Sequence, residues 1–329
     1  EAVGPAGVPA DVRPGRAPAA RPAPPTVVIP AALAENVTKV WKDAGRQWLA
    51  ELPDRLTGIA RTWDLEIGTP YELSYHWVCR ATRADGTPAV LKVGVPGAEH
   101  LRAETATLRA WDGHGAVRLL EYDAAAGALL LERAEPGTPA SSLVPQHDER
   151  ATAAAIEVAG RLHMPVDTDP PVPDVAGQAA DFAAHLREHP TGGPLPRGLV
   201  IRAVGLFAEL TASATERVYL HGDLHHDNVL AADREPWLVI DPHGVLGDPA
   251  YDVGSWLHNP DPPRGNPEVL RLLPRRIEQL ADGLALPIER VVAYGFVKAV
   301  LSEVWTCEDG GVPGGSALAV ATALLPRLA

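Results

Sequence analysis

Residues 221–228, which read HGDLHHDN, are dense in side chains that could do chemistry. Asp223 precedes Asn228 by five positions, and a further carboxylate, Asp241, follows Asp223 by 18. Amide and carboxylate oxygens are hard ligands that suit Mg²⁺. A metal held in this way neutralises phosphate charge, and a carboxylate beside it orients an attacking hydroxyl, as phosphoryl transfer requires. A plain loop of turn-forming Asp and Asn is the alternative, but it would leave the residue types and their spacing to coincidence.

The interval between Asp223 and Asn228 is that of the protein-kinase catalytic loop, in which the Asp receives the substrate hydroxyl proton and the Asn holds Mg²⁺. Kinases need a second metal-binding Asp further along the chain. Asp241 follows a plausible hairpin of strands 229–231 and 237–240. The spacing therefore favours a phosphotransferase.

Lys92 is one of only four lysines, against 25 arginines, and it lies in the apolar strand-like run 90–93. A kinase needs a cation on the α/β-phosphates, held in place by a helix carboxylate. Glu104, in a helix expected over 101–111, is the best partner, and Glu99 is the second choice. We expect Lys92 to bind phosphate.

The segment 68–75, GTPYELSY, is the candidate loop over the phosphates, but it lacks the three-glycine pattern of protein kinases. Ser74 and Tyr75 could lie near the nucleotide, and a plain hairpin turn fits the segment equally well. Adenine is expected to bind the backbone near Glu132 and Ala134, where a first lobe would end, because clefts between lobes are favoured ligand sites.

The secondary structure that must position these residues is expected to differ along the chain, with strands first and mostly helices later. Apolar residues from Leu33 to Leu52 recur every three or four positions, which predicts an amphipathic helix. Asp85-Gly86 predicts a tight turn between strands 76–83 and 88–94. Two further strands are expected beyond the helix 101–111, over 117–122 and 128–132.

After Pro139 the pattern becomes helical, interrupted only by the predicted hairpin 229–240. Helices are expected over 149–163, 178–189, 198–216, 274–284 and 288–305. The helix over 274–284 is expected to have a proline in its first turn. The prediction is an α+β fold with two lobes, a β-rich N-terminal lobe over 31–134 and a mostly helical C-terminal lobe over 135–329.

The amino-acid composition predicts a disordered tail and indicates which partners and which compartment are expected. Residues 1–30 contain eight prolines and seven alanines, and we expect a disordered tail there. The formal net charge of −13 disfavours nucleic acid and suits a cationic partner. Two cysteines rule out a disulfide framework and favour a reducing, cytoplasmic location. No apolar run approaches the length of a membrane helix.

The motif His-Gly-Asp-x-His-x-x-Asn, followed by Asp241-Pro242, resembles the aminoglycoside phosphotransferase family, relatives of the protein kinases. More narrowly, the chain resembles the aminoglycoside/hydroxyurea resistance kinases. The supporting segments are 85–92 (DGTPAVLK), 117–120 (VRLL), 129–133 (LLLER), 236–242 (PWLVIDP) and 247–252 (GDPAYD). The resemblance covers roughly residues 31–329 and implies a protein-kinase-like fold.

The resemblance implies that Asp223 is the catalytic base and that Asn228 and Asp241 bind Mg²⁺. His221 would fix the loop, and His225 would either pack or approach the acceptor. Other acidic residues nearby are expected to be structural or solvated, namely Asp227, Asp248 and Asp252. The implied activity is ATP-dependent phosphorylation of a hydroxyl on an aminoglycoside, streptomycin-like antibiotic.

Glu303, Glu308 and Asp309 cluster at the end of the helix 288–305 and just beyond it. Carboxylates are disfavoured at a helix C-terminus by the macrodipole, so their position needs an explanation. They form either a solvated loop or a patch that binds a cationic acceptor. The segment 305–310, WTCEDG, agrees with the resemblance and favours the patch.

Two other functions stay open. A kinase of the same fold could act on a sugar, an amino sugar or a hydroxyurea-like metabolite. A nucleotide-binding module without turnover is less favoured, because it would not need the complete set of Lys92, Asp223, Asn228 and Asp241.

Overall fold

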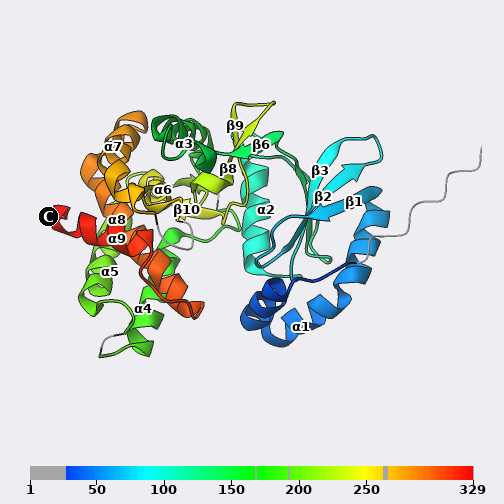
Figure 1. The fold of residues 1–329 in the computed structure, drawn as a ribbon, viewed down its shortest axis with the longest axis horizontal. Helices are drawn as coiled ribbons and strands as arrows, with labels where there is room; N and C mark the ends of the chain where they lie inside the picture. Colours follow the sequence, from blue (N-terminus) through cyan, green and yellow to red (C-terminus); the bar gives the residue numbers. More distant parts are fainter. Residues whose placement is uncertain (1–26, 167–168, 192, 262–265, 329) are drawn as a thin grey trace, which may run out of the picture.

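The computed structural model describes residues 27–166, 169–191, 193–261 and 266–328. A β-rich lobe and a helical lobe lie side by side along the longest axis of the molecule (Figure 1). The α+β, bilobal prediction is confirmed. Most of the predicted tail lies outside the described residues. Of the remainder, Val27 and Ile29 pack against the core of the N-terminal lobe.

A five-stranded antiparallel sheet forms the N-terminal lobe, with the order β1-β2-β3-β5-β4. Its strands are β1 (Leu65–Pro70), β2 (Trp77–Arg83), β3 (Pro88–Val93), β4 (Leu119–Asp123) and β5 (Ala128–Glu132). The turn between β2 and β3 is as predicted: Gly86 has a φ of +84°, and the Thr87 amide donates to the Asp85 carboxylate at 2.9 Å.

Two helices cover the sheet on opposite faces (Figure 1). Helix α1 (Ala31–Thr62), which bends at the non-helical Lys42, shares a core with Leu130. Helix α2 (Glu99–Trp111) lies on the face of Leu129 and Leu131, whose core continues into the C-terminal lobe. The alternation of side chains along β5 thus joins the sheet to both layers.

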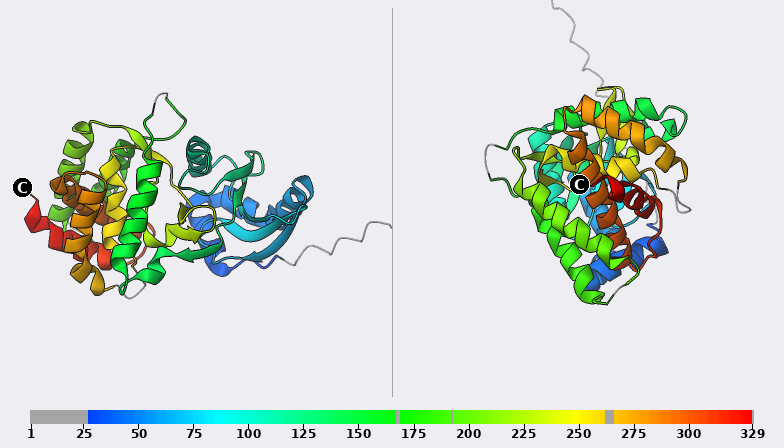
Figure 2. Two further views of the ribbon diagram at one scale, coloured as in Figure 1. Left: turned by 90° about the horizontal axis from the view of Figure 1, so that it is seen from above. Right: turned by 90° about the vertical axis from the view of Figure 1, so that its left-hand side faces the viewer.

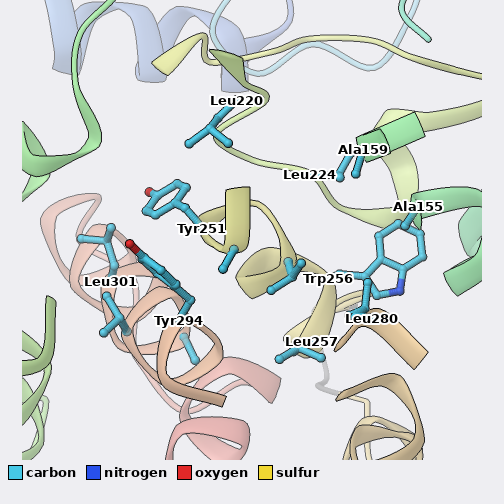
Figure 3. Packing of buried hydrophobic residues seen from close by; sticks show 14 of the residues in the cluster. Ala155, Ala159, Leu220, Leu224, Tyr251, Trp256, Leu257, Leu280, Tyr294 and Leu301 are labelled. Atoms are coloured by element: carbon cyan, nitrogen blue, oxygen red, sulfur yellow. The ribbon is translucent and has the colours of Figure 1, made fainter. Parts of the chain in front are cut away.

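The C-terminal lobe packs its helices around α8 (Ile288–Glu308). The others are α3 (Asp148–Leu162), α4 (Ala179–Glu188), α5 (Arg197–Ala212), α6 (Val253–His258), α7 (Glu268–Gly283) and α9 (Ser316–Leu324). Helix α8 is apolar around much of its circumference, as expected of a core helix. Tyr251, Tyr294 and Leu301 lie together in this core (Figure 3).

Short strands lie at the junction of the two lobes (Figures 1 and 2). The predicted hairpin is β8 (Val229–Ala232) and β9 (Trp237–Val239), which β6 (Pro136–Pro139) extends to three strands. A separate pair consists of β7 (Val218–Leu220) and β10 (Val245–Gly247). The 3₁₀ turns are Ala140–Leu143, Val175–Gln178, His226–Asn228, Pro249–Tyr251 and Leu325–Arg327.

Several sequence predictions were incomplete. The hairpin 229–240 is not the only interruption of the helical lobe, because β6, β7 and β10 are present as well. Helix α7 begins at Glu268, so Pro274 lies inside it and not in its first turn. The buried face of α7 runs continuously from Val269 to Leu280 past the proline, which explains the longer helix. None of the described helices is long and apolar enough to cross a membrane.

Candidate active site

The loop after β7 is braced by Asp252, at the start of α6. Its carboxylate accepts hydrogen bonds from the backbone amides of His221 at 2.9 Å and Gly222 at 2.8 Å. The His221 ring makes a further hydrogen bond with the Ile240 carbonyl at 2.9 Å. Gly222 has a φ of +84°, a conformation that favours glycine. His221 and Asp252 therefore have the structural roles predicted for them, and they fix the backbone immediately before Asp223.

The Asp223 carboxylate lies between a hydroxyl and two imidazoles. Ser255 donates to its Oδ1 at 3.0 Å, and the Nε2 atoms of His225 and His243 are 3.6 and 4.0 Å from its Oδ2. Burial alone would raise the pKa of Asp223, but His225, His243 and Lys298 outweigh it and hold the pKa below its usual range. The group is therefore a carboxylate at neutral pH, and it can accept a hydrogen bond from a hydroxyl.

Asn228 and Asp241 come together at the open end of the β8–β9 hairpin. The Ile240 amide donates to the Asn228 carbonyl at 3.0 Å, which places the two residues on adjoining backbone. The Asn228 side-chain amide donates to the Asp223 carbonyl at 3.1 Å, so its oxygen is left for a cation. Asp241 has a φ of +55° and keeps 60% of its side chain exposed.

This pair fits Mg²⁺, which usually takes one or two protein oxygens and completes its shell with phosphates and water. Within the described ranges, no group of three or more His, Cys, Asp or Glu side chains could hold a metal by itself. A site that depends on the nucleotide's phosphates is consistent with that finding.

Lys92 is 4% exposed and lies between two carboxylates. Its Nζ is 2.7 Å from Glu104 Oε2 and 2.5 Å from Asp241 Oδ1. Burial by itself lowers the pKa of Lys92, but Asp241 and Glu104 outweigh it and raise the pKa. The predicted partner, Glu104, is confirmed, and Lys92 is fixed as an ammonium group at the wall of a cleft.

That cleft has a volume of about 800 Å³ and lies between the sheet and the junction of the lobes. Its wall contains Lys92, Glu104 and Asp241 together with the predicted nucleotide residues Glu132 and Ala134. Apolar side chains complete it, among them Val90, Val117, Leu131 and Ile240. Ligand pockets of this size and mixed character hold molecules as large as a nucleotide.

The loop 71–76 joins β1 to β2 and contains no glycine. Ser74 lines the cleft, whereas Tyr75 reaches across to the other lobe. The Tyr75 hydroxyl donates to Asp309 Oδ2 at 2.9 Å, and Lys39 Nζ is 3.7 Å from Asp309 Oδ1. Asp309 therefore links the end of α8 to the N-terminal lobe, a contact across 234 positions that sequence spacing could not reveal.

The three acidic residues predicted for the acceptor differ in their surroundings. Glu303 is 3% exposed, and its carboxylate accepts from the amides of Gly314 at 3.1 Å and Leu318 at 2.9 Å. This geometry ties α8 to α9. Glu308, by contrast, is exposed and has no ion-pair partner among the described residues.

Glu308 lies in an acidic surface shared by α4 and α8, formed by Asp181, Glu188, Glu308 and Asp309. Burial raises the pKa of Glu308, and Asp181, Asp309 and Glu188 raise it further. Trp305 donates its ring N–H to Asp181 at 2.9 Å, and its ring lies 6.4 Å from that of His243, which faces Asp223. The acidic surface is thus connected to the catalytic loop. Sequence reasoning missed Asp181 and Glu188, because only the packing of α4 on α8 brings them here.

This arrangement is that of a protein-kinase-like phosphotransferase with a hydroxyl group as acceptor. The β-sheet lobe supplies the Lys–Glu pair, and the junction with the helical lobe supplies the ionised aspartate and the Asn–Asp pair. The sequence profile of the aminoglycoside/hydroxyurea antibiotic resistance kinases matches residues 70–310. The chain belongs to this family, and the resemblance in the catalytic motif is confirmed.

Two relatives show the range of acceptors named in the family, and one solved structure shows the fold. The chain is 33% identical to streptomycin 6-kinase of Streptomyces glaucescens over 292 residues, 86% of this chain and 92% of the relative. It is 35% identical to hydroxyurea phosphotransferase of Kitasatospora aureofaciens over 322 residues, 92% and 87% of the two chains. A choline kinase from Streptococcus pneumoniae has the same fold, with a TM-score of 0.59 at 13% identity over 84% of this chain and 98% of that one.

Proposed function

We propose that this kinase transfers the γ-phosphoryl group of Mg·ATP to a hydroxyl of a cationic, streptomycin-like aminoglycoside. The acidic surface carries the proposal: among the described residues, Asp309 has an ion-pair partner, Lys39 at 3.7 Å, but Asp181, Glu188 and Glu308 present carboxylates without one beside the loop that holds Asp223. The predicted substrate residues Glu308 and Asp309 belong to this surface. Glu303 remains a weaker candidate because backbone amides occupy its carboxylate.

The nucleotide would occupy the cleft beside Lys92. Lys92 would bind the α/β-phosphates, with Glu104 holding its ammonium group in place. Asn228 and Asp241 would hold Mg²⁺, which when bound neutralises phosphate charge. Arg234 binds the Glu132 carboxylate at 2.8 Å, and the Glu132 amide donates to the Arg118 carbonyl at 2.9 Å, so adenine would bind the backbone just beyond Glu132, near Ala134.

The acceptor hydroxyl would donate to Asp223 while its oxygen attacks the γ-phosphorus. As the new O–P bond forms, the bond to the β-phosphate oxygen breaks, and the hydroxyl proton passes to Asp223. Ser255 and the imidazole of His225 orient that carboxylate. His225 would act on Asp223 and not only through packing, although its Nδ1 also accepts from the Asp227 amide at 3.2 Å.

The relative that phosphorylates hydroxyurea marks the rival function. Hydroxyurea is small and uncharged, so it gives no role to an acidic surface spread over two helices. A guanidinium or ammonium ligand gives each carboxylate a counter-charge, and each charge-assisted hydrogen bond contributes about 1.5–3 kcal/mol.

An ADP-release assay with streptomycin, hydroxyurea and an uncharged sugar as acceptors tests the proposal. We expect Mg²⁺-dependent turnover with streptomycin at the lowest KM and a phosphate ester as product. Faster turnover with hydroxyurea would favour the rival function. ADP release that no acceptor stimulates would contradict both functions.

A further inference from the structure

Lys298, in the middle of α8, is a buried charged group that the reaction described above does not use. It is 1% exposed, and its Nζ donates to the Gly222 carbonyl at 2.9 Å and to the Tyr251 hydroxyl at 3.1 Å. Gly222 directly precedes Asp223 in the catalytic loop. A side chain from the core helix of the lobe therefore contacts the backbone beside the proposed base.

Lys298 packs directly against the backbone of α6 at Gly254, where a side chain would not fit. A Cβ atom on Gly254, in α6, would lie 2.5 Å from the Cγ of Lys298. The next residue along α6 is Ser255, which donates to the Asp223 carboxylate. One short helix thus supplies both the gap through which Lys298 reaches the loop and a hydrogen bond to Asp223.

No ordinary ion pair compensates the charge of Lys298. Among the described residues, no carboxylate oxygen lies within 4.0 Å of its Nζ. Two aromatic rings face it instead, with centroids at 4.6 Å for Tyr251 and 5.0 Å for Trp305. Burial lowers the pKa of Lys298, while Asp223 and Asp252 oppose this and favour the charged form.

Burying an ammonium without a salt bridge is costly, so a contribution to stability alone is a poor explanation for it. The carboxylate of Asp223 is among the charges that act on it. Tyr251, seen beside α8 in Figure 3, also donates its hydroxyl to Gln178, which directly precedes α4. The contacts of Lys298 therefore extend from the catalytic loop towards the helix that carries Asp181.

We propose that Lys298 is a positioning residue for phosphoryl transfer: its ammonium group fixes the backbone before Asp223 and balances the negative charge of that carboxylate. The inference rests on the proposed role of Asp223 as the base. It assigns Lys298 no contact with the nucleotide or the acceptor. Removing the charge should therefore lower kcat and leave both KM values nearly unchanged. The loss should require an intact Asp223.

A double-mutant cycle tests this dependence. Lys298→Met keeps the length of the side chain and removes the charge, and we expect kcat to fall about 10- to 100-fold with both KM values nearly unchanged. In the Asp223→Asn background, the same substitution should lower kcat by less than about 3-fold. Val300→Ala, which trims a buried side chain of the same helix, is the matched control and should leave kcat near wild type.

Equal losses from Lys298→Met in the two backgrounds would overturn the inference and make Lys298 a structural residue. Wild-type kcat in Lys298→Met would overturn it as well. Near-wild-type turnover of Asp223→Asn alone would overturn the base assignment instead, so the two failures are distinguishable.

If Lys298→Met does not fold, Tyr251→Phe takes its place in the cycle, because it removes one acceptor of the ammonium and keeps the charge. We then expect a loss in kcat of about 3-fold or more that disappears in the Asp223→Asn background. A loss of equal size in both backgrounds would overturn the inference.

Discussion

On the nucleotide side of the catalytic centre, the cation Lys92 is buried between Glu104 and Asp241, so the protein supplies its own counter-charges. On the acceptor side, Glu308 lies among Asp181, Glu188 and Asp309 with like charges around it. The difference shows in the pKa values: the neighbours of Lys92 stabilise its charge, whereas the neighbours of Glu308 oppose its ionisation.

This contrast distinguishes two ways of preparing a binding site. The nucleotide side is preorganised, because the position of Lys92 does not depend on a ligand. On the proposed acceptor side, Lys39 is a counter-charge only for Asp309, and Glu308 is repelled by Asp181 and Glu188. A cationic ligand would relieve that repulsion, and part of its binding free energy would come from the relief. Changes on one side should therefore leave the affinity of the other side almost intact.

The largest effect is expected where the two sides meet, at Asp223. Asp223→Asn keeps the shape of the side chain and removes the proton acceptor, so kcat should fall at least about 100-fold. The affinity for Mg·ATP, measured by calorimetry, should change little because Asp223 holds neither the metal nor Lys92. Turnover close to wild type would remove Asp223 from the mechanism.

On the nucleotide side, Asp241→Ala removes a proposed metal ligand and one counter-charge of Lys92. The affinity for Mg·ATP should fall at least about 10-fold, as expected for losing a charged contact. Titration with ATP in EDTA is the internal control and should show no such loss. Unchanged Mg·ATP affinity would contradict the metal assignment.

Tyr75 joins the loop 71–76 on the nucleotide side to Asp309 in the acidic surface. A substitution of Tyr75 therefore tests whether a change at the contact between the two sides alters the affinity for one ligand or for both. Burial, together with the hydrogen bond to Asp309 and its negative charge, raises the pKa of Tyr75 to about 12, so the hydroxyl stays a donor. Tyr75→Phe should raise KM for ATP about 2- to 10-fold, the range for the net contribution of an ordinary hydrogen bond.

The control for Tyr75 is Tyr122→Phe, which removes a hydroxyl from β4 and should leave both KM values unchanged. A rise in the acceptor KM alone in Tyr75→Phe would contradict the role of Asp309 as a link to the nucleotide loop.

The smallest effect concerns pH. Because the pKa of Glu308 is raised, its negative charge is lost earlier than usual as the pH falls from neutrality. Cation binding needs that charge, so KM for a cationic acceptor should rise with falling pH, by no more than about 3-fold at this partly exposed site. The rise should be absent in Glu308→Gln. An equally steep pH profile in that variant would assign the dependence to another group.

The two sides also differed in how far the sequence could predict them. The nucleotide side depends on residue types at fixed intervals, so spacing predicts Asp223, Asn228 and Asp241. Lys92 is predicted because it is a rare lysine in an apolar strand. The tight turn at Asp85-Gly86 was predictable for the same reason, because its conformation depends on two adjacent residues.

The acceptor side depends on packing between distant helices. Asp181 meets Glu308 only because α4 lies on α8. Glu303 is occupied by one amide from the loop between α8 and α9 and by one from α9, elements that the sequence did not predict. Strands of three residues, such as β7 and β10, are too short to show an alternating pattern, so they were missed. Lys298 escaped notice because its apolar neighbours in α8 indicate only a core helix.

The most direct test of this account compares Glu308→Gln with Glu289→Gln, a matched change at the opposite end of α8. Steady-state kinetics with streptomycin and Mg·ATP would measure both KM values in each variant. If the acidic surface binds the acceptor, Glu308→Gln raises KM for streptomycin about 10-fold, the loss of one charge-assisted contact. KM for ATP stays unchanged, and Glu289→Gln behaves like wild type. An unchanged KM for streptomycin in Glu308→Gln, or an equal rise in Glu289→Gln, would contradict it.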